Sequence, residues 1–352
     1  MNTKIKELQL DFLKSNCNST IKHLLFLYLK DTKSKEFKTN YNALLKSPII
    51  SYWKKNIPKD IANTTILGSS DSCFENSFGK LLSFGLSVND ILTQSLLQKY
   101  ISFLNTNQKN SIYDTLAHYV VAGYLYAAGS SDEIVQKIVL DRINTLYNFV
   151  TKSPIKYNIY VDASSFKVPK QYKSKKLVNP ILYKNNELIL PLIYDIFIFH
   201  YIYDRLSWDH KKKINTIIDY IAHNKYQSFD YGYGIIKTSQ NKFHFMGWSA
   251  HLPLFNKNLS SNYFKKGLIY RMALFSKFKN QNIQLWLKET LLKLEEFKLD
   301  NYRYCFSSDL LPEIKNSYFM NGRHTSLNEN RKQKIGKMIE STYYAYLVSK
   351  NN

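Results

Sequence analysis

The chain has 352 residues, of which 44% are hydrophobic, enough apolar side chains for one large core or two ordinary ones. This composition excludes an intrinsically disordered chain. The formal net charge of +22 comes mainly from scattered lysines, and the runs at 173–176 and 211–213 are too short for the basic arms typical of nucleic-acid tails. Charge alone therefore leaves open both a solvated basic surface and a polyanion-binding protein.

The three cysteines, Cys17, Cys73 and Cys305, lie far apart and form neither a CxxC pair nor a Cys/His pair at ligand spacing. We therefore expect no disulfide framework, no metal site and no cofactor. Residues 1–16 are polar and helix-patterned, unlike a secretory signal, so a cytoplasmic location is expected.

Apolar residues recur at steps of three and four along most of the chain, the spacing of amphipathic helices. Asn18 and Asp132 are suited to cap helix starts, Pro191 to a first helical turn, and Gly129 to a left-handed helix end. The sequence therefore predicts an all-α fold of helical hairpins, which we expect to form an α/α toroid. A single domain over 1–352 is favoured, with 1–70 as an N-terminal helical extension. The predicted helices span 4–15, 19–30, 74–86, 90–104, 112–128, 132–152, 191–206, 209–224, 263–277, 283–298 and 331–348.

The first stretch that breaks the helical pattern is 153–187. It contains Pro154, Pro169 and Pro180, and it is rich in aromatic residues and poor in Ser-Gly runs. We therefore predict a long ordered loop near 153–187, because flexible linkers have the opposite composition.

An apolar segment at 188–203 follows this loop. It is shorter than the roughly 20 residues that cross a bilayer, and it contains Asp195 and His200. It is predicted to be a buried core helix, and no transmembrane segment is expected. A buried carboxylate is costly unless a cation or tyrosine hydroxyls partner it, so Asp195 is a candidate catalytic residue.

The second break is the segment DYGYGIIKTSQNKFHFMGWSAHLPLF, which predicts a β-hairpin near 231–248. The hairpin would gather aromatic rings with two imidazoles that titrate near neutrality. We assign Tyr233, His244 and His251 as candidate catalytic residues, and Tyr231 and Trp248 as candidate substrate-binding residues. The alternative is a local aromatic cluster that closes the helical body.

Further charged residues are candidates for substrate binding. Asp71 and Glu75 have the spacing of adjacent helical turns, which suits a carboxylate pair or a helix start. Near the C-terminus, arginines that can bind carboxylates or phosphates lie among acidic residues and a histidine. The alternative there is a salt-bridged loop that packs the last helix. The candidate substrate-binding residues are Glu75, Arg303, Arg323 and Glu329, and Glu313, His324 and Arg331 belong to the same C-terminal group.

A set of residues in these segments carries a resemblance to a known family: Glu75 and Asn76, Asp195, Tyr233 and Gly234, Gly247 and Trp248, His251 to Pro253, Leu311 to Glu313, and Glu329 with Asn330. These residues are called landmarks below. With them the chain resembles, from about Phe74 to its C-terminus, uncharacterised bacterial proteins that look like distant members of the terpenoid cyclase and protein prenyltransferase superfamily. The resemblance implies an α/α toroid with a central cavity. The DxDD motif and QW repeats of class II cyclases are absent, and the Asp-Cys-His zinc set of prenyltransferases cannot be placed. The implied fold is therefore better supported than the implied reaction.

Three functions remain open. The first is an enzyme, or degenerate enzyme, with a Tyr/Trp/His-lined cavity for a small-molecule substrate, either an isoprenoid cyclase-like or a lyase-type enzyme acting on an isoprenoid, polysaccharide or peptide. The second is a helical protein that binds nucleic acid or another polyanion, since Tyr172 leads into Lys173, Lys175 and Lys176. The third is a catalytically silent scaffold.

Overall fold

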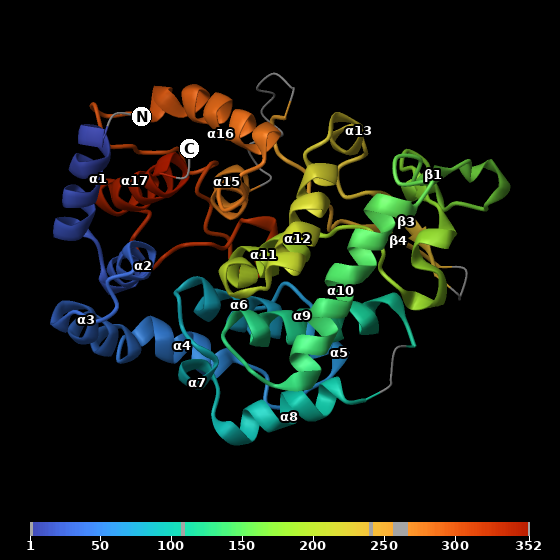
Figure 1. Ribbon diagram of the computed structural model, residues 1–352, viewed down its shortest axis with the longest axis horizontal. Helices are drawn as coiled ribbons and strands as arrows, with labels where there is room; N and C mark the ends of the chain where they lie inside the picture. The colour runs from blue at the N-terminus through green and yellow to red at the C-terminus, as the bar shows by residue number, and fades with distance from the viewer. Residues whose placement is uncertain (1–2, 107–109, 239–241, 256–266, 351–352) are drawn as a thin grey trace. The chain divides into compact units, whose positions relative to one another are not determined.

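Helices make up most of the described chain, as the sequence predicts (Figure 1). The computed structural model describes residues 3–106, 110–238, 242–255 and 267–350. The chain divides into two compact units. Unit 1 consists of Met1–Phe103, Ala127–Ser130 and Pro253–Asn352, and unit 2 of Leu104–Tyr126 and Ser131–Leu252. This division does not decide whether each unit folds alone, so the single domain over 1–352 with its extension at 1–70 stays a prediction.

Unit 1 brings together helices from both ends of the chain. The first helix packs against the last, and α15 also contacts α17 (Figure 1). Within the N-terminal part, α2 packs on α3 and α4 on α6. The helices are α1 (Thr3–Asn16), α2 (Ser19–Leu29), α3 (Lys35–Leu45), α4 (Pro48–Asn56), α5 (Asn63–Ile66), α6 (Phe74–Ser83), α7 (Val88–Ile91), α8 (Gln94–Leu104), α15 (Leu268–Phe275), α16 (Gln281–Lys293) and α17 (Lys334–Lys350), with short 3-10 helices η5 (Leu294–Phe297) and η6 (Phe319–Asn321).

Some helix predictions in unit 1 are wrong in detail. The single helix expected over 90–104 is two, because Asp90 accepts from the Ser87 backbone N–H at 3.0 Å and so starts α7 early, and the backbone extends at Leu92. No helix was predicted between 30 and 74, where α3, α4 and α5 form. Part of the helix expected over 263–277 is α15, and residues 263–266 lie outside the described residues.

Unit 2 is built around a buried apolar helix, α11 (Ile193–Ile202). Its residues from Ile193 to Phe199 are all buried, so the prediction of a buried core helix is confirmed. In the described ranges no helix has the length and apolar character needed to cross a membrane. The other helices are α9 (Ile112–Ala127), α10 (Glu133–Lys152), α12 (Trp208–Ile221) and α13 (Asn224–Gln227), with 3-10 helices η1 (Ala163–Ser165), η2 (Lys170–Tyr172), η3 (Pro180–Asn186) and η4 (Tyr203–Arg205); α10 packs along α12.

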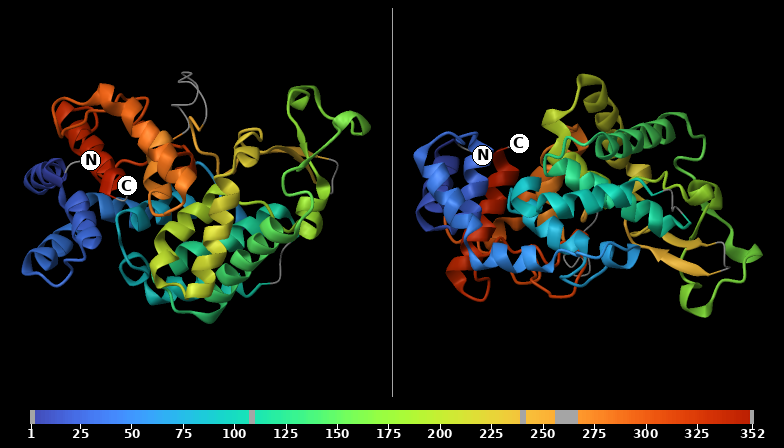
Figure 2. Two further views of the ribbon diagram at one scale, coloured as in Figure 1. Left: turned by 45° about the horizontal axis from the view of Figure 1, so that its top comes forward. Right: turned by 90° about the horizontal axis from the view of Figure 1, so that it is seen from below.

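A small sheet departs from the all-α expectation. The predicted hairpin is confirmed as β3 (Gly234–Lys237) and β4 (Phe243–Met246), which pair antiparallel; residues 239–241 between them lie outside the described residues. The segment 153–187, expected to be a loop, supplies β1 (Tyr160–Val161) and β2 (Leu177–Val178). The strand order is β1-β2-β3-β4, and β2 runs parallel to β3. The β3–β4 hairpin is visible as two adjacent yellow-orange arrows in the right-hand view of Figure 2. Leu177 and Val178 have no exposed surface, so burial of these side chains accompanies the pairing.

Gly234 sets how closely β2 and β3 approach. Its φ is 105°, and a Cβ at this position would lie 2.3 Å from the backbone oxygen of Lys176, which accepts from the N–H of Ile235 at 2.9 Å. Because a backbone atom cannot move aside alone, Gly234→Ala is expected to lower the free energy of unfolding by about 2 kcal/mol, measured by urea denaturation. Gly247→Ala is the control, since its Cβ would meet only the Phe245 side chain, at 3.3 Å. Equal losses in both variants would contradict this account.

Candidate functional site

The candidate site residues are distributed over both units, so each group is described within its own unit. Unit 2 contains Asp195, Tyr231, Tyr233, His244, Trp248 and His251. Unit 1 contains Glu75, Arg303, Arg323 and Glu329.

Asp195 forms a buried ion pair with Arg142. The Nε and Nη2 groups of Arg142 donate to Oδ1 and Oδ2 of Asp195 at 2.9 and 2.8 Å, and the two side chains are 9% and 0% exposed. The N–H of Leu192 donates to the same carboxylate at 2.6 Å, and Nη2 donates to the Leu190 oxygen at 2.8 Å. Burial acts to lower the pKa of Arg142, but the carboxylate of Asp195 raises it above its usual value. The cation that Asp195 needs therefore comes from α10, and the pair ties α10 to the start of α11.

Tyr233 has no exposed surface and lies in a chain of hydroxyl hydrogen bonds. The N–H of Ala250 donates to the Tyr226 hydroxyl at 3.0 Å, the two tyrosine oxygens are 2.6 Å apart, and the Tyr233 hydroxyl donates to the Pro191 oxygen at 2.5 Å. Burial, followed by the neighbouring Tyr226, raises the pKa of Tyr233 well above its ordinary value. The hydroxyl therefore stays protonated near neutral pH and joins three segments of unit 2.

His251 is also engaged at both ring nitrogens. Nδ1 lies 2.7 Å from the Ser249 hydroxyl, and Nε2 lies 3.1 Å from the Phe229 oxygen. Because a carbonyl only accepts, Nε2 carries a proton, and Nδ1 accepts from the hydroxyl in the neutral ring. The Ser249 oxygen in turn accepts from the N–H of Gly232 at 2.9 Å. This arrangement satisfies the imidazole internally, at 6% exposure.

The remaining aromatic candidates of unit 2 lie in two groups of ring contacts, one around Tyr113 and one around His251. The Tyr113 ring lies 5.7 Å from both His244 and Trp248, edge-on to each. The Tyr231 and His251 rings are also 5.7 Å apart. The hairpin thus gathers the predicted side chains, and their contacts fit the alternative of a local aromatic cluster. Their catalytic and binding roles stay predictions.

The candidate residues of unit 1 lie in different environments, from fully buried to exposed. Glu75 lies fully buried in the first turn of α6, whereas Asp71 is in the turn that precedes the helix, so the two are not on adjacent helical turns. Arg303 donates to Asp300 at 2.6 Å, and Arg323 is exposed. Glu329 accepts from the N–H of Asn18 at 2.8 Å, and burial raises its pKa.

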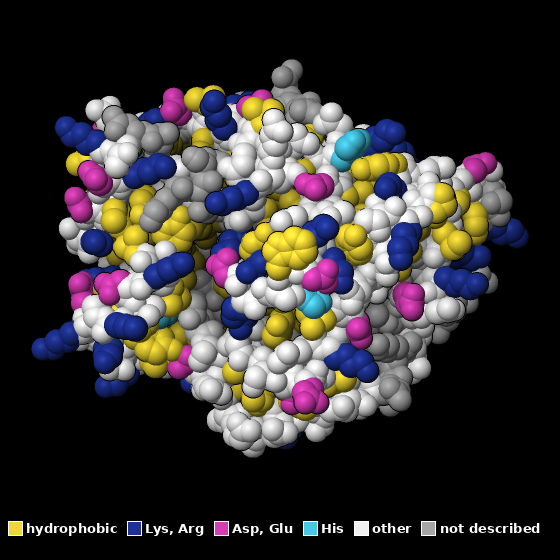
Figure 3. Space-filling model, in the orientation of Figure 1, with side chains coloured by type: hydrophobic (Ala, Val, Ile, Leu, Met, Phe, Trp, Pro, Cys, Tyr) yellow, Lys and Arg dark blue, Asp and Glu magenta, His cyan; other side chains and the backbone are white. Residues whose placement is uncertain are grey.

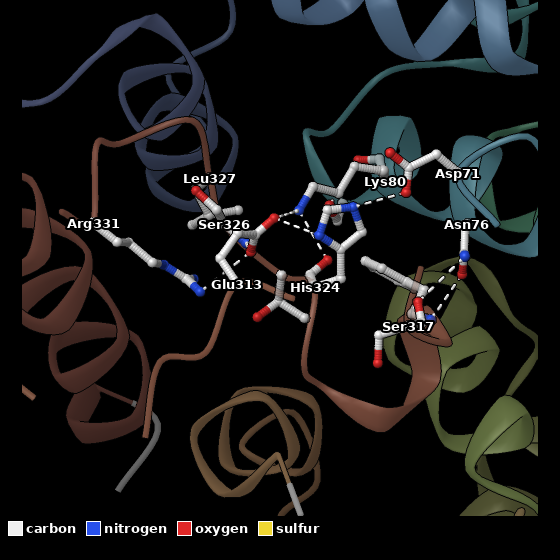
Figure 4. Close-up of polar contacts among 12 residues, drawn as sticks. Asp71, Asn76, Lys80, Glu313, Ser317, His324, Ser326, Leu327 and Arg331 are labelled. Carbon is white, nitrogen blue, oxygen red and sulfur yellow. Dashed lines mark hydrogen bonds and ion pairs between the residues drawn. The ribbon is translucent and has the colours of Figure 1, made fainter. Parts of the chain in front are cut away.

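A cluster around His324 is the strongest constellation in unit 1. Nε2 of His324 lies 3.2 Å from Oδ1 of Asp71, and Nδ1 lies 2.5 Å from Oε1 of Glu313 (Figure 4). The hydroxyl of Tyr52 donates to Oδ2 of Asp71 at 2.7 Å. A neutral imidazole has one N–H and can donate to only one carboxylate, whereas a protonated ring can donate to both. Each ring nitrogen of His324 lies close to one carboxylate.

Lys80 places a cation beside this cluster. Its Nζ donates to the His324 oxygen at 2.9 Å and lies 3.5 Å from Oε1 of Glu313, with only 2% of the side chain exposed. The ammonium also lies 5.7 Å from the centre of the Trp53 ring. Burial lowers the pKa of Lys80, and Glu313 opposes that shift. Lys80 projects from α6, so the helix sets its position.

The loop that carries His324 is fixed by a second ion pair, between Arg331 and Glu340. Nε of Arg331 donates to Oε2 of Glu340, and the other oxygen accepts from the Leu327 N–H at 2.6 Å. Nη1 of Arg331 donates to the Pro312 oxygen at 2.7 Å and lies 3.4 Å from Oε2 of Glu313. Burial acts to lower the pKa of Arg331, but Glu340 raises it. This pair therefore holds the segments around Glu313 and Leu327 in place.

The His324 cluster forms part of the wall of a cavity of about 440 Å³ in unit 1. Tyr52 at its edge is 45% exposed, and Glu313 is 30% exposed, while His324 is 6% exposed. A solute in this cavity can thus reach the two ends of the array directly and the ring through them. The lining residues are Ile49, Tyr52, Trp53, Asp71, Lys80, Glu313, Lys315, His324, Ser326, Asn328, Glu329 and Asn330.

Glu313 gives this cluster a dependence on pH. Burial acts to raise its pKa, but Lys80, His324 and Arg331 together lower it from 4.5 to about 2. Since the folded pKa lies below the unfolded one, the ionised carboxylate stabilises the fold above about pH 4.5 and this contribution is lost as the pH falls toward 2. We expect the unfolding free energy to drop by roughly 2 kcal/mol between about pH 6 and pH 3 because of Glu313.

Denaturant unfolding at these pH values, with wild type and Glu313→Gln, measures the contribution. The difference between the two proteins should shrink as the pH falls. Glu296→Gln is the control, because Glu296 is exposed and on the same unit. A difference that is independent of pH would contradict the assignment.

Sequence reasoning found part of this cluster. Glu313, His324 and Arg331 were grouped from their closeness in sequence, and Asp71 was noted separately. Lys80 and its link to them were missed, because α6 and the His324 segment are 244 positions apart. The residue that could have been noticed is Lys80 itself, a lysine among the apolar positions of an amphipathic helix.

No group of three or more His, Cys, Asp or Glu residues in the described ranges is arranged to hold a metal ion. The chain matches no protein-family model, no curated protein and no solved structure. Function must therefore be inferred from the geometry of the sites.

Proposed function

We propose that the chain is an enzyme that transfers a proton to or from a small polar substrate bound in the cavity beside His324. The observation that supports this is a histidine whose two ring nitrogens lie 3.2 and 2.5 Å from two carboxylates at a cavity wall. An imidazole between two carboxylates is a residue type that serves as a general acid or base in proton transfer. Tyr52 and Glu313 are the more exposed side chains of this array, so a bound substrate can contact them.

The cavity lining favours a hydroxylated substrate over an isoprenoid. Most lining side chains carry a hydroxyl, amide or charge, and Ile49 and Trp53 are its apolar members. An isoprenoid needs extended apolar walls, whereas sugar or peptide groups can hydrogen-bond to Ser326, Asn328 and Asn330. Of the reactions that the sequence leaves open, a lyase-type proton transfer on a sugar or peptide therefore fits best.

The α/α toroid and the kinship with terpenoid cyclases remain part of this proposal. They are supported by the mostly helical fold and by two landmark groups, Leu311–Glu313 and Glu329–Asn330, that contribute to the cavity lining. They do not depend on an isoprenoid substrate.

The test is a turnover screen of the purified chain against mono- and oligosaccharides, peptides and hydroxy acids, read out by mass spectrometry. Wild-type protein is compared with His324→Gln, which keeps hydrogen bonding but does not titrate. We expect conversion of at least one compound by wild type and its loss in the variant. Equal conversion by wild type and His324→Gln would exclude His324 as the proton-transfer residue. Failure of the wild-type protein to convert or retain any compound of these classes would contradict the proposal that the chain is an enzyme.

A further inference from the structure

The sheet end of unit 2 carries an excess of positive charge that the proposed function does not use. The segment 153–187 has seven lysines against Asp162 and Glu187, and the hairpin adds Lys237 and Lys242 without an acidic residue. Lys and Arg side chains lie beside hydrophobic ones over this end of unit 2, at the right of the view (Figure 3). The exposed lysines here are Lys167, Lys170, Lys173, Lys175, Lys176, Lys184 and Lys242.

Aromatic rings share one face of the sheet with Lys237. Residues paired across β3 and β4 point to the same side, so the pairs Ile235 with Phe245 and Lys237 with Phe243 place both phenylalanines and Lys237 on one face. Phe245 is 42% exposed although it is a large apolar ring. A phenylalanine that exposes its ring on a strand is available for stacking.

Two of these phenylalanine rings lie close to a lysine ammonium group in cation–π geometry. Lys175 lies 5.6 Å from the centre of Phe245, and Lys237 lies 5.3 Å from the centre of Phe166. Each pair sets a positive charge beside an aromatic face. A ligand that offers a flat ring next to an anionic group matches both features of each pair.

We propose that this lysine and aromatic surface, formed by Phe166, Lys175, Lys237, Phe243 and Phe245, binds single-stranded nucleic acid. The lysines contact successive phosphates, and unpaired bases stack on the phenylalanine rings. A duplex fits less well because its base faces are covered, and a sulfated sugar or lipid headgroup has no planar ring for Phe245. All five residues lie in unit 2, whereas the residues of the His324 cluster belong to unit 1.

The experiment is fluorescence anisotropy with the full chain and a labelled single strand of about 15 nucleotides, as DNA and as RNA, over a range of salt. The matched duplex is the second probe. Wild type is expected to prefer the single strand, with affinity that falls as salt rises. Phe245→Ala should weaken binding roughly tenfold, and Phe245→Tyr should restore it because the ring remains.

Lysine variants distinguish direct phosphate contacts from nonspecific electrostatic attraction by the basic surface. Lys175→Gln should weaken binding and reduce the slope of log affinity against log salt by about 0.7, the value for one phosphate contact on a single strand. Lys137→Gln is the control, since Lys137 is exposed near the start of α10 and about 22 Å along that helix from its end before β1. The control should bind as wild type does.

Three results would overturn the proposal. One is absence of binding to any single strand. Another is equal affinity for single strand and duplex with no effect of Phe245→Ala, which would reduce the surface to nonspecific phosphate attraction. The third is tighter binding to heparin or to vesicles of anionic lipid through the same lysines.

Discussion

Asp195→Asn is expected to lower the free energy of unfolding by about 3–5 kcal/mol. The substitution leaves the guanidinium of Arg142 buried beside a neutral amide, and an uncompensated buried charge carries a cost of this size. The amide oxygen can still accept from Leu192, so most of the loss should come from the ion pair. Urea denaturation followed by circular dichroism measures it.

The neighbouring Asp141 supplies the control for this substitution. Asp141 lies next to Arg142 on α10 but is exposed, so Asp141→Asn should change stability by less than about 0.5 kcal/mol. The double variant Arg142→Met with Asp195→Leu should recover part of the loss, because it removes both charges. A loss below about 1 kcal/mol in Asp195→Asn would contradict this account and show that the ion pair is dispensable for folding.

His324→Gln is expected to lower kcat/KM for the substrate of the cavity by roughly 10²–10⁴-fold, the range that a positioned proton-transfer group supplies. Asp71→Asn should lower it less, because Glu313 still orients the ring. The kinetic constants separate a catalytic from a structural role: a loss in kcat with KM and the unfolding curve unchanged would indicate that His324 acts in the chemical step.

Ser317 provides a matched control in the same unit. Its backbone oxygen accepts from Asn76 at 3.3 Å and its side chain is not part of the His324 cluster, so Ser317→Ala should retain wild-type kcat/KM (Figure 4). Loss of activity in Ser317→Ala equal to that in His324→Gln would mean that both act through the local fold. Wild-type unfolding curves for all variants are required for the comparison.

Local features of this fold could be predicted from the sequence because their causes are local. Asn18 caps α2 by accepting from the N–H groups of Thr20 and Ile21, as its position before an apolar run predicts. The β3–β4 hairpin also forms within one short stretch.

The helices α3 and α4 were missed although their starts can be read. Ser34 accepts from the Phe37 N–H, and Pro48 follows Ser47 at a first turn. Their bodies are polar enough to hide the apolar face, since Leu44, Ile50 and Trp53 are their buried hydrophobic residues. A weak apolar stripe gives weak periodicity, so capping residues are the better indicator here.

Pairings across long stretches of chain could not be predicted. Arg142 on α10 pairs with Asp195 on α11, and β2 pairs with β3 although three α-helices separate them in the sequence. Lys80 donates a hydrogen bond to His324, which lies 244 positions later. Each partner is an ordinary residue in its own segment. These residues come together only in the tertiary structure, which sequence periodicity and spacing do not indicate.

Unit 1 is made of segments from both ends of the chain, so its parts are synthesised at different times. Lys80 leaves the ribosome 244 residues before His324, a delay of roughly 10–50 s at ordinary translation rates. Unit 2 is complete in the nascent chain before the C-terminal part of unit 1 exists. During that interval Lys80 has no His324 oxygen to accept its hydrogen bond and α1 has no α17 to pack against, so both contacts can form only after the C-terminal helix is synthesised.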